Sequence, residues 1–181
     1  MGMALMVPRY TVDDLERLPE DGNRYEILDG VLLVTPAPSS GHQIVANRIQ
    51  TRLTAALEGT NLAHVVGPGA IAVPPRTQLQ PDVLVYPACF VPGAEWATIT
   101  EHWLAVEVLS RSSRVYDCEV KRAAYFALGV RQLWLADSRD RSIEIWRSPR
   151  VHHVERGAIR WRVPGSSLTI TVDLTAVFAG F

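Results

Sequence analysis

The stretch that most constrains the fold is WLAVEVLS, residues 103–110, which is apolar at almost every position. A strand with one face in water alternates apolar and polar side chains, whereas a strand covered on both faces is apolar along its length. Residues 103–110 therefore predict the central strand of a sheet. RQLWLAD, residues 131–137, predicts a second buried strand. Both strands require further layers of structure packed on each side of the sheet.

Turn and capping signals predict two elements near the start of the chain. Thr11 and Asp14 have the spacing of a helix cap and predict a short helix near 12–18. Asp29-Gly30 is a two-residue turn signal between apolar runs, and it predicts a β-hairpin. We therefore expect a small N-terminal hairpin ahead of the first long helix.

Two helices are predicted beyond this hairpin. Ser40 and Gln43 have capping-box spacing, and Gly59 ends an amphipathic stretch, which together predict a helix over 39–59. Residues 116–130 predict a second helix, between the two buried strands. Short strands and hairpins fill the rest of the chain. The expected class is α/β, with a mixed β-sheet flanked by helices.

Composition indicates one compact domain, residues 1–181, with the profile of a soluble protein. Hydrophobic residues make up 48% of the chain and charged residues 20%. We see no apolar run of about eighteen residues, which a membrane helix requires, and no secretion signal, so we expect a cytoplasmic protein with no membrane partner. The net charge of −1 argues against a strongly electrostatic nucleic-acid binder, although a local arginine patch would not show in this sum.

Two carboxylates stand where the pattern predicts buried strands. Glu107 lies in the middle of the predicted central strand, and Asp82 opens the strand PDVLVY. A buried charge costs several kcal/mol unless it is paired or binds a metal. Two neighbouring carboxylates favour a hard cation such as Mg²⁺. The alternative is that Glu107 pairs with a buried arginine and Asp82 caps a turn.

Lys121 is the only lysine of the chain, whereas seventeen positions carry arginine. On the predicted second helix it shares one face with Ala124 and Tyr125, so we expect its ammonium to face the sheet. An inward ammonium can orient a water molecule or stabilise charge on a phosphoryl oxygen. The alternative is a lysine kept by chance, which extends its ammonium to solvent. Tyr125 and Trp134 are interpreted as core aromatic residues.

PD at 81–82, VEVLS at 106–110 and Lys121 together resemble the PD-(D/E)XK nuclease superfamily. More narrowly, the chain is similar to the Uma family of restriction-endonuclease-like proteins. The matching segments are LPEDGNRYEILDGVLLVTPAPSSGHQ, PDVLVY, LAVEVLSRSSRVYDCEVKRAAYFALGVRQLWLAD and VPGSSLTITVDLTAVF. The resemblance implies a restriction-endonuclease-like mixed sheet with extra hairpins at both ends. The superfamily lysine usually follows the glutamate by two residues, where this chain has Leu109, so the resemblance implies that Lys121 takes its role from the next helix.

The resemblance also implies a reaction, which is hydrolysis of DNA phosphodiester bonds with Mg²⁺ or Mn²⁺ as cofactor. Asp82, Glu107 and the carbonyl of Val108 would bind the metal, and Lys121 would orient the water or contact the phosphate. Glu26 matches a glutamate that the family places near the metal, so it is a further catalytic candidate. Its alternative role is that of an ordinary residue at the end of a hairpin strand.

Three more residues are candidates for binding the substrate. His42 occupies the family's HQ position, and Arg111 and Arg114 follow the central strand, where they could contact a nucleic-acid backbone. A structural imidazole at a helix start and two solvated loop arginines are the alternatives.

Assembly and substrate leave several interpretations open. The strands IEIWR and IRWRV carry tryptophans that we expect to be exposed, and such a surface suits a two-fold homodimer. The chain could also be a non-catalytic binding or dimerisation module that keeps the nuclease fold. A third interpretation is a metal-dependent phosphoesterase acting on RNA or a small phosphodiester.

Overall fold

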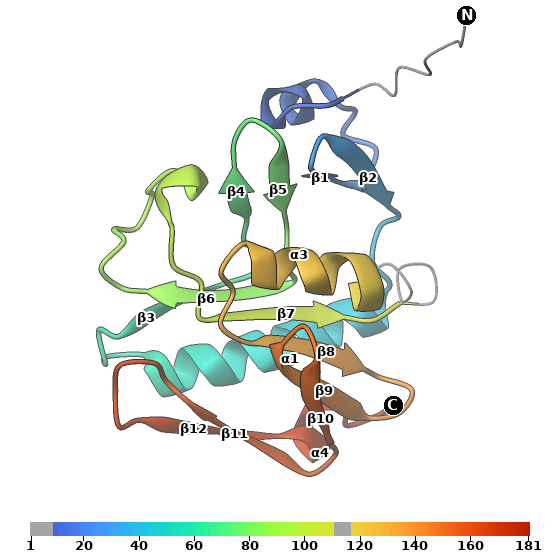
Figure 1. Ribbon diagram of the computed structural model, residues 1–181. Helices are drawn as coiled ribbons and strands as arrows, with labels where there is room; N and C mark the ends of the chain where they lie inside the picture. The colour runs from blue at the N-terminus through green and yellow to red at the C-terminus, as the bar shows by residue number, and fades with distance from the viewer. Residues whose placement is uncertain (1–8, 111–116) are drawn as a thin grey trace, which may run out of the picture.

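The computed structural model describes residues 9–110 and 117–181 and contains three β-sheets with helices around them (Figure 1). The largest sheet has six strands in the order β10-β9-β8-β7-β6-β3. Its strands are β3 (Ala63–Val66), β6 (Val83–Pro87), β7 (Leu104–Val108), β8 (Leu133–Asp137), β9 (Ser142–Ser148) and β10 (Val151–Glu155). This sheet forms the middle of the molecule.

Strand β7 lies at the centre of this sheet. It pairs antiparallel with β6 and parallel with β8. Every residue of β6, β7 and β8 is buried, which confirms the predictions for residues 103–110 and 131–137. The connection from β7 to β8 carries a π-helical turn, Asp117–Lys121, followed directly by α3 (Arg122–Ala127).

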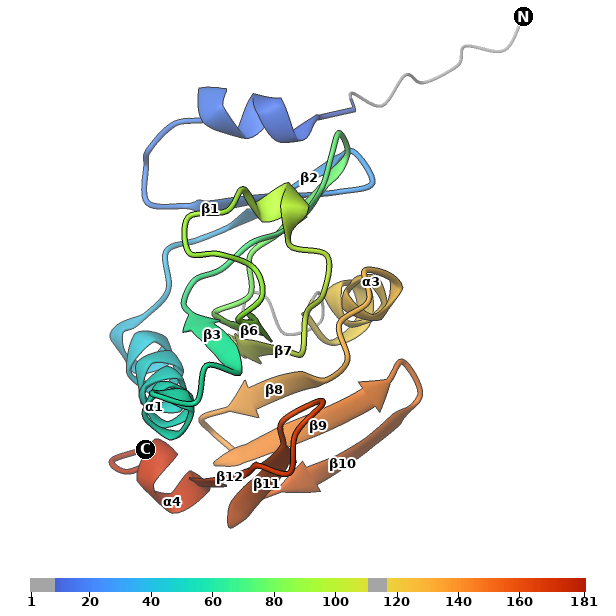
Figure 2. The same cartoon turned by 90° about the vertical axis from the view of Figure 1, so that its left-hand side faces the viewer.

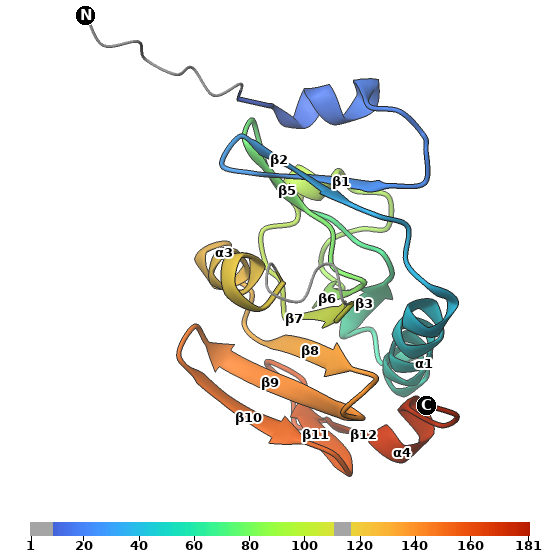
Figure 3. The ribbon, with the colours of Figure 1, turned by 90° about the vertical axis from the view of Figure 1, so that its right-hand side faces the viewer.

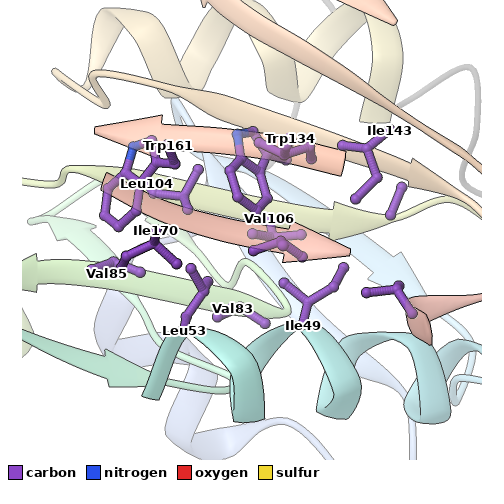
Figure 4. Close-up of a cluster of buried hydrophobic side chains, with 14 of the residues drawn as sticks. Ile49, Leu53, Val83, Val85, Leu104, Val106, Trp134, Ile143, Trp161 and Ile170 are labelled. Carbon is purple, nitrogen blue, oxygen red and sulfur yellow. The ribbon is translucent and has the colours of Figure 1, made fainter. Parts of the chain in front are cut away.

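Helix α1 (Ser40–Leu57) covers one face of the sheet, and α3 lies over the other, as Figures 2 and 3 show from opposite sides. Ile49 and Leu53 of α1 pack against valines of β6 and β7 (Figure 4). The hairpin of β11 (Ala158–Arg162) and β12 (Thr169–Asp173), followed by α4 (Leu174–Val177), extends the same core. These layers exclude water from one whole face of the central strands.

A smaller sheet packs on the face that carries α3. Its four strands run in the order β2-β1-β5-β4. They are β1 (Arg24–Leu28), β2 (Val31–Thr35), β4 (Ile71–Val73) and β5 (Thr77–Leu79). A short 3₁₀ helix, η2 (Trp96–Thr98), packs Trp96 against the buried side chains that this sheet shares with α3. The three-residue strand β5 was not predicted, because TQL is too short and too polar for a periodic signal.

The N-terminal predictions are confirmed. Leu28 pairs with Val31 across a turn in which Asp29 and Gly30 both have positive φ, 50° and 82°. This is the backbone geometry that favours Asp-Gly in a two-residue hairpin. The predicted short helix is a 3₁₀ helix, η1 (Val12–Arg17), whose Asp14 carboxylate accepts the Thr11 backbone N–H at 2.8 Å.

The start of α1 differs from the prediction by one residue. Ser39, and not Ser40, is the N-cap, and its hydroxyl accepts the backbone N–H of His42 at 3.3 Å. Gln43 makes no capping-box contact, since its backbone N–H bonds to the Ser39 carbonyl. Ser39 keeps an extended backbone after Pro38, so the helix begins only at the next residue. The cap fixes the first turn of the helix, which carries His42.

The prediction of exposed tryptophans is wrong. Trp146 is 6% exposed and Trp161 is 2% exposed. Trp161 meets Trp134 edge to face at 6.4 Å, and Trp146 stacks on His152 at 3.9 Å while the Arg122 guanidinium lies 4.0 Å from its ring. Each ring is thus covered by the protein's own side chains and offers no apolar surface to a second copy.

Among the described residues, no helix has both the length and the apolar character that crossing a bilayer requires.

Candidate active site

The candidate site lies where β6 begins and β7 ends. Because these strands are antiparallel with Val83 opposite Val106, Asp82 comes to lie beside Glu107. The Asp82 carboxylate Oδ2 accepts the backbone N–H of Val108 at 2.8 Å. Asp82 is 5% exposed and Glu107 3% exposed, so the pairing of the two strands places two buried carboxylates together.

Lys121 reaches these carboxylates from the π-helical turn that leads into α3. Its Nζ lies 2.6 Å from Oε2 of Glu26 and donates to Oε1 of Glu107 at 3.3 Å. The side chain is 3% exposed. The π-helical turn that ends at Lys121 has a wider repeat than the α-helix after it, a feature often found at functional sites. Lys121 therefore faces inward, as the helix pattern predicts.

Tyr125 binds the same carboxylate one helical turn later. Its hydroxyl donates to Oε1 of Glu107 at 2.5 Å, and the residue is fully buried. The prediction of a core aromatic residue is confirmed by this burial, but no motif or spacing indicated the polar contact. Glu107 thus receives hydrogen bonds from both Lys121 and Tyr125, which compensates for the cost of burying its charge.

Strand β1 supplies two further site residues, Arg24 and Glu26. Oε1 of Glu26 accepts the backbone N–H of Gln80 at 2.7 Å, and Arg24 donates to the Gln80 carbonyl at 3.1 Å. A second Arg24 nitrogen, Nη2, lies 2.8 Å from Oδ1 of Asp82. Alternate residues of a strand share a face, so Arg24 could have been inferred once Glu26 was considered. It was missed because arginine is so common in this chain.

These ion pairs shift the acidity of both partners. Burial raises the pKa of the Asp82 carboxyl, but the hydrogen bond and charge of His42 and the charge of Arg24 outweigh burial, so this pKa falls below its usual 3.8. Burial lowers the pKa of the Arg24 guanidinium, and the charges of Asp82, Glu107 and Glu26 more than reverse this effect. Asp82 and Arg24 are therefore both charged at neutral pH.

His42 approaches Asp82 from the first turn of α1. Its Nε2 lies 3.0 Å from Oδ2 of Asp82, and its side chain is 12% exposed. Its other ring nitrogen, Nδ1, is buried and has no hydrogen-bond partner among the described residues. The family-based candidate His42 therefore lies within the same cluster as the carboxylates.

A pocket of about 410 Å³ opens beside this cluster. Its polar side includes Arg24, His42, Glu107 and Lys121, and its apolar wall includes Pro36 and Phe181. The pocket connects the buried charges to the surface and is large enough to admit part of a substrate.

The donor set fits a hard divalent cation, provided that the cation shares or displaces the contact of Arg24 with Asp82. Mg²⁺ commonly binds through one or two carboxylates and keeps several waters, and Asp82 and Glu107 supply two carboxylates beside Val108, which lines the pocket. Within residues 9–110 and 117–181, three or more His, Cys, Asp or Glu side chains do not converge as metal ligands. Oδ1 of Asp82 is also bound by Arg24, so a cation has to share or displace this contact.

The structure brings Asp82, Glu107, Lys121, Glu26 and His42 into one cluster. Two other candidates, Arg111 and Arg114, lie outside the described residues.

The mixed sheet, with buried carboxylates where β6 begins and β7 ends, agrees with the restriction-endonuclease-like fold that the resemblance implies. The model of the Uma2 family, described as "Putative restriction endonuclease", matches residues 12–175, and the chain belongs to this family. A comparison with curated proteins finds no match.

A solved structure gives independent support for the fold. The chain is similar to a crystal structure from Anabaena variabilis described as "a putative nuclease belonging to DUF820", with a TM-score of 0.74 and 18% identity over 93% of this chain and 97% of that chain. The predicted α/β, restriction-endonuclease-like fold is thereby confirmed, including the hairpins at both ends. Family and fold together support a nuclease-type function.

We predict that Lys121 and Glu26 are strongly coupled in stability. Glu26→Gln and Lys121→Met should each lower the free energy of unfolding by about 3–5 kcal/mol, because each removes one partner of a buried ion pair. The double variant should lose clearly less than the sum of the two, as measured by urea denaturation.

The exposed pair Arg131–Glu101 serves as the control, with side chains 54% and 38% exposed. Arg131→Met should cost at most about 1 kcal/mol, because solvent screens this pair. Additive losses for Glu26→Gln and Lys121→Met would contradict the buried ion pair.

Proposed function

We propose that the chain is a divalent-metal-dependent endonuclease that hydrolyses DNA phosphodiester bonds. The observation that carries this proposal is Lys121, the only lysine, buried 3.3 Å from Glu107 at the edge of a pocket, in a chain of the Uma2 family. A buried ammonium among carboxylates is costly to maintain for stability alone. It is well suited to acting on a water molecule or a phosphoryl oxygen.

The roles of the residues follow from their contacts. Mg²⁺ or Mn²⁺, held by Asp82, Glu107 and the Val108 carbonyl, would lower the pKa of a bound water and neutralise charge on the phosphate. Lys121 would orient the attacking water or donate to a phosphate oxygen. Glu26 would hold the Lys121 ammonium in position through its 2.6 Å contact. Tyr125 would fix the Glu107 carboxylate through its hydrogen bond.

We expect the purified protein to cut DNA in the presence of Mg²⁺ or Mn²⁺. Glu107→Gln should lower the cleavage rate by at least about 100-fold, because loss of a general acid–base or metal-binding group has effects of that size. Gel electrophoresis of a plasmid and a linear duplex measures both nicking and double-strand cutting.

Glu16→Gln is the matched control for this experiment, because Glu16 is exposed on η1 and lies outside the site. Circular dichroism and urea denaturation should show that both variants are folded. Equal cleavage by Glu107→Gln and the wild type would refute the catalytic role of this site. RNA and small phosphodiesters in parallel reactions separate the substrate classes.

The charge distribution supports nucleic acid as the substrate. Residues 139–162 contain seven arginines and three acidic residues, and all seven arginines are exposed. Residues 10–30 contain seven acidic residues and two arginines. The net charge of −1 therefore conceals a basic C-terminal part, which could attract a phosphate backbone.

Two of these arginines suit a direct test. Arg160 and Arg162 alternate with the buried residues Ile159 and Trp161 on β11, so both point outward on one face. Arg160→Gln with Arg162→Gln should weaken duplex binding and reduce the slope of log affinity against log salt by up to about two. Fluorescence anisotropy with the Glu107→Gln background measures this slope without cleavage. Arg17→Gln, in the acidic part, should leave the slope unchanged.

A non-catalytic binding module is the second candidate function. The observation that favours it is that Arg24 already forms an ion pair with Asp82 and that His42 lies 3.0 Å from the same carboxylate, so the protein's own side chains can hold it. A homodimer stays part of the proposal because two-fold symmetry would suit the cutting of two DNA strands. The expected apolar surface does not support it, because Trp146 and Trp161 are buried.

Calorimetric titration separates the module from the nuclease. If the chain is a nuclease, Mn²⁺ should bind with one site per chain, and Asp82→Asn should weaken that binding by at least about tenfold, because a carboxylate ligand is lost. Absence of binding, or binding that Asp82→Asn does not affect, would favour the module.

A further inference from the structure

Arg24 occupies the oxygen of Asp82 that a cation would need. Oδ2 of Asp82 is held by the backbone N–H of Val108 at 2.8 Å, and His42 lies close to the same atom. Oδ1 receives the Nη2 donor of Arg24 at 2.8 Å. The strand contact at Oδ2 is part of the fold, so Oδ1 is the oxygen that remains to be shared. A guanidinium and a divalent cation at one carboxylate oxygen repel each other.

The described residues of the cluster carry charges of both signs. Three buried carboxylates, Glu26, Asp82 and Glu107, face two permanent cations, Lys121 and Arg24. A divalent cation alone would add two positive charges to this buried set, whereas a cation together with one phosphodiester group would add only one. A phosphodiester group therefore lowers the electrostatic cost of placing a cation beside Arg24.

Arg24 is also the cation that has room to move. Its side chain is 16% exposed and lines the pocket, whereas the Lys121 side chain is 3% exposed and held between two carboxylates. Its other donor contact is a single bond to the Gln80 carbonyl at 3.1 Å. The guanidinium can therefore turn from Asp82 toward the pocket without breaking the Glu26–Lys121–Glu107 contacts. Its planar, two-nitrogen end matches the oxygens of a phosphate.

We propose that Arg24 holds the cation-facing oxygen of Asp82 in the free protein and transfers to a substrate phosphate when a divalent cation binds. Cation and phosphodiester then bind cooperatively, each favouring the other through Arg24. The phosphate half of this inference rests on the proposed function, but the competition between Arg24 and the cation does not. Arg24 is thus a substrate-binding residue that also limits metal binding in the absence of substrate.

Titration of the full chain with Mn²⁺ alone tests the competition. Arg24→Met should bind Mn²⁺ at least about fivefold more tightly than the wild type, because the competing cation is gone. Arg139→Met is the control, since Arg139 lines the same pocket and bonds to Asp137 through its backbone N–H at 2.9 Å, a contact that the substitution leaves in place. Unchanged or weaker Mn²⁺ binding by a folded Arg24→Met protein would overturn the proposal.

A second measurement uses the wild type and so does not depend on a variant that folds. Mn²⁺ affinity is compared with and without a charged phosphorothioate dinucleotide, and again with a neutral methylphosphonate dinucleotide. The charged probe should tighten Mn²⁺ binding by at least about fivefold and the neutral probe should not, because only the former offers Arg24 an anionic partner in place of Asp82. This coupling should shrink in Arg24→Met. Equal effects of both probes in the wild type would refute the phosphate half.

The outcomes also separate this inference from the proposed function. Tighter Mn²⁺ binding by Arg24→Met in a protein that cuts no nucleic acid would support the competition and refute the nuclease. Normal cleavage by the wild type with no tightening in Arg24→Met would refute the competition and leave the nuclease intact.

Discussion

The ion network of Glu26, Lys121 and Glu107 is the interaction on which the arrangement of the site depends. Each residue comes from a different layer: Glu26 from the small N-terminal sheet, Glu107 from the central sheet and Lys121 from the turn before α3. All three are at most 3% exposed. An unpaired charge at such depth is strongly unfavourable, so the three layers are stabilised only in the relative position that brings these charges together.

This dependence explains how the N-terminal sheet contributes to the site. β1 contacts the segment before β6 through Gln80, whose N–H binds Glu26 and whose carbonyl binds Arg24. That same segment leads directly into Asp82. The small sheet thus carries two charged side chains to the end of the central sheet and fixes the residue that precedes Asp82 by two positions. Two sheets with separate pairing therefore share one polar cluster.

The elements that carry a strong local signal could be predicted from the sequence. The apolar run at 103–110 predicts a central strand, and the helix pattern predicts an inward Lys121, because both depend on the periodicity of a single element. The contact of Arg24 with Asp82 and that of the Tyr125 hydroxyl with Glu107 could not be predicted in this way. Their partners, Asp82 and Glu107, lie on other elements, and nothing in the sequence spacing states which strand ends meet. The tryptophans of β9 and β11 were misjudged for the same reason, since partners from other elements bury them.

The antiparallel pairing of β6 and β7 determines where the buried negative charges of the site lie. It places Asp82 beside Glu107 and thereby concentrates negative charge at one end of the sheet. Lys121 pairs with Glu26 and Glu107, whereas the counter-ion of Asp82 is Arg24 from β1. Arg24 also borders a pocket of about 410 Å³, where solvent or a ligand can reach it. Of the charged side chains of this cluster that line the pocket, Arg24 is the least buried, at 16% exposed, which is the arrangement expected of a group that exchanges partners.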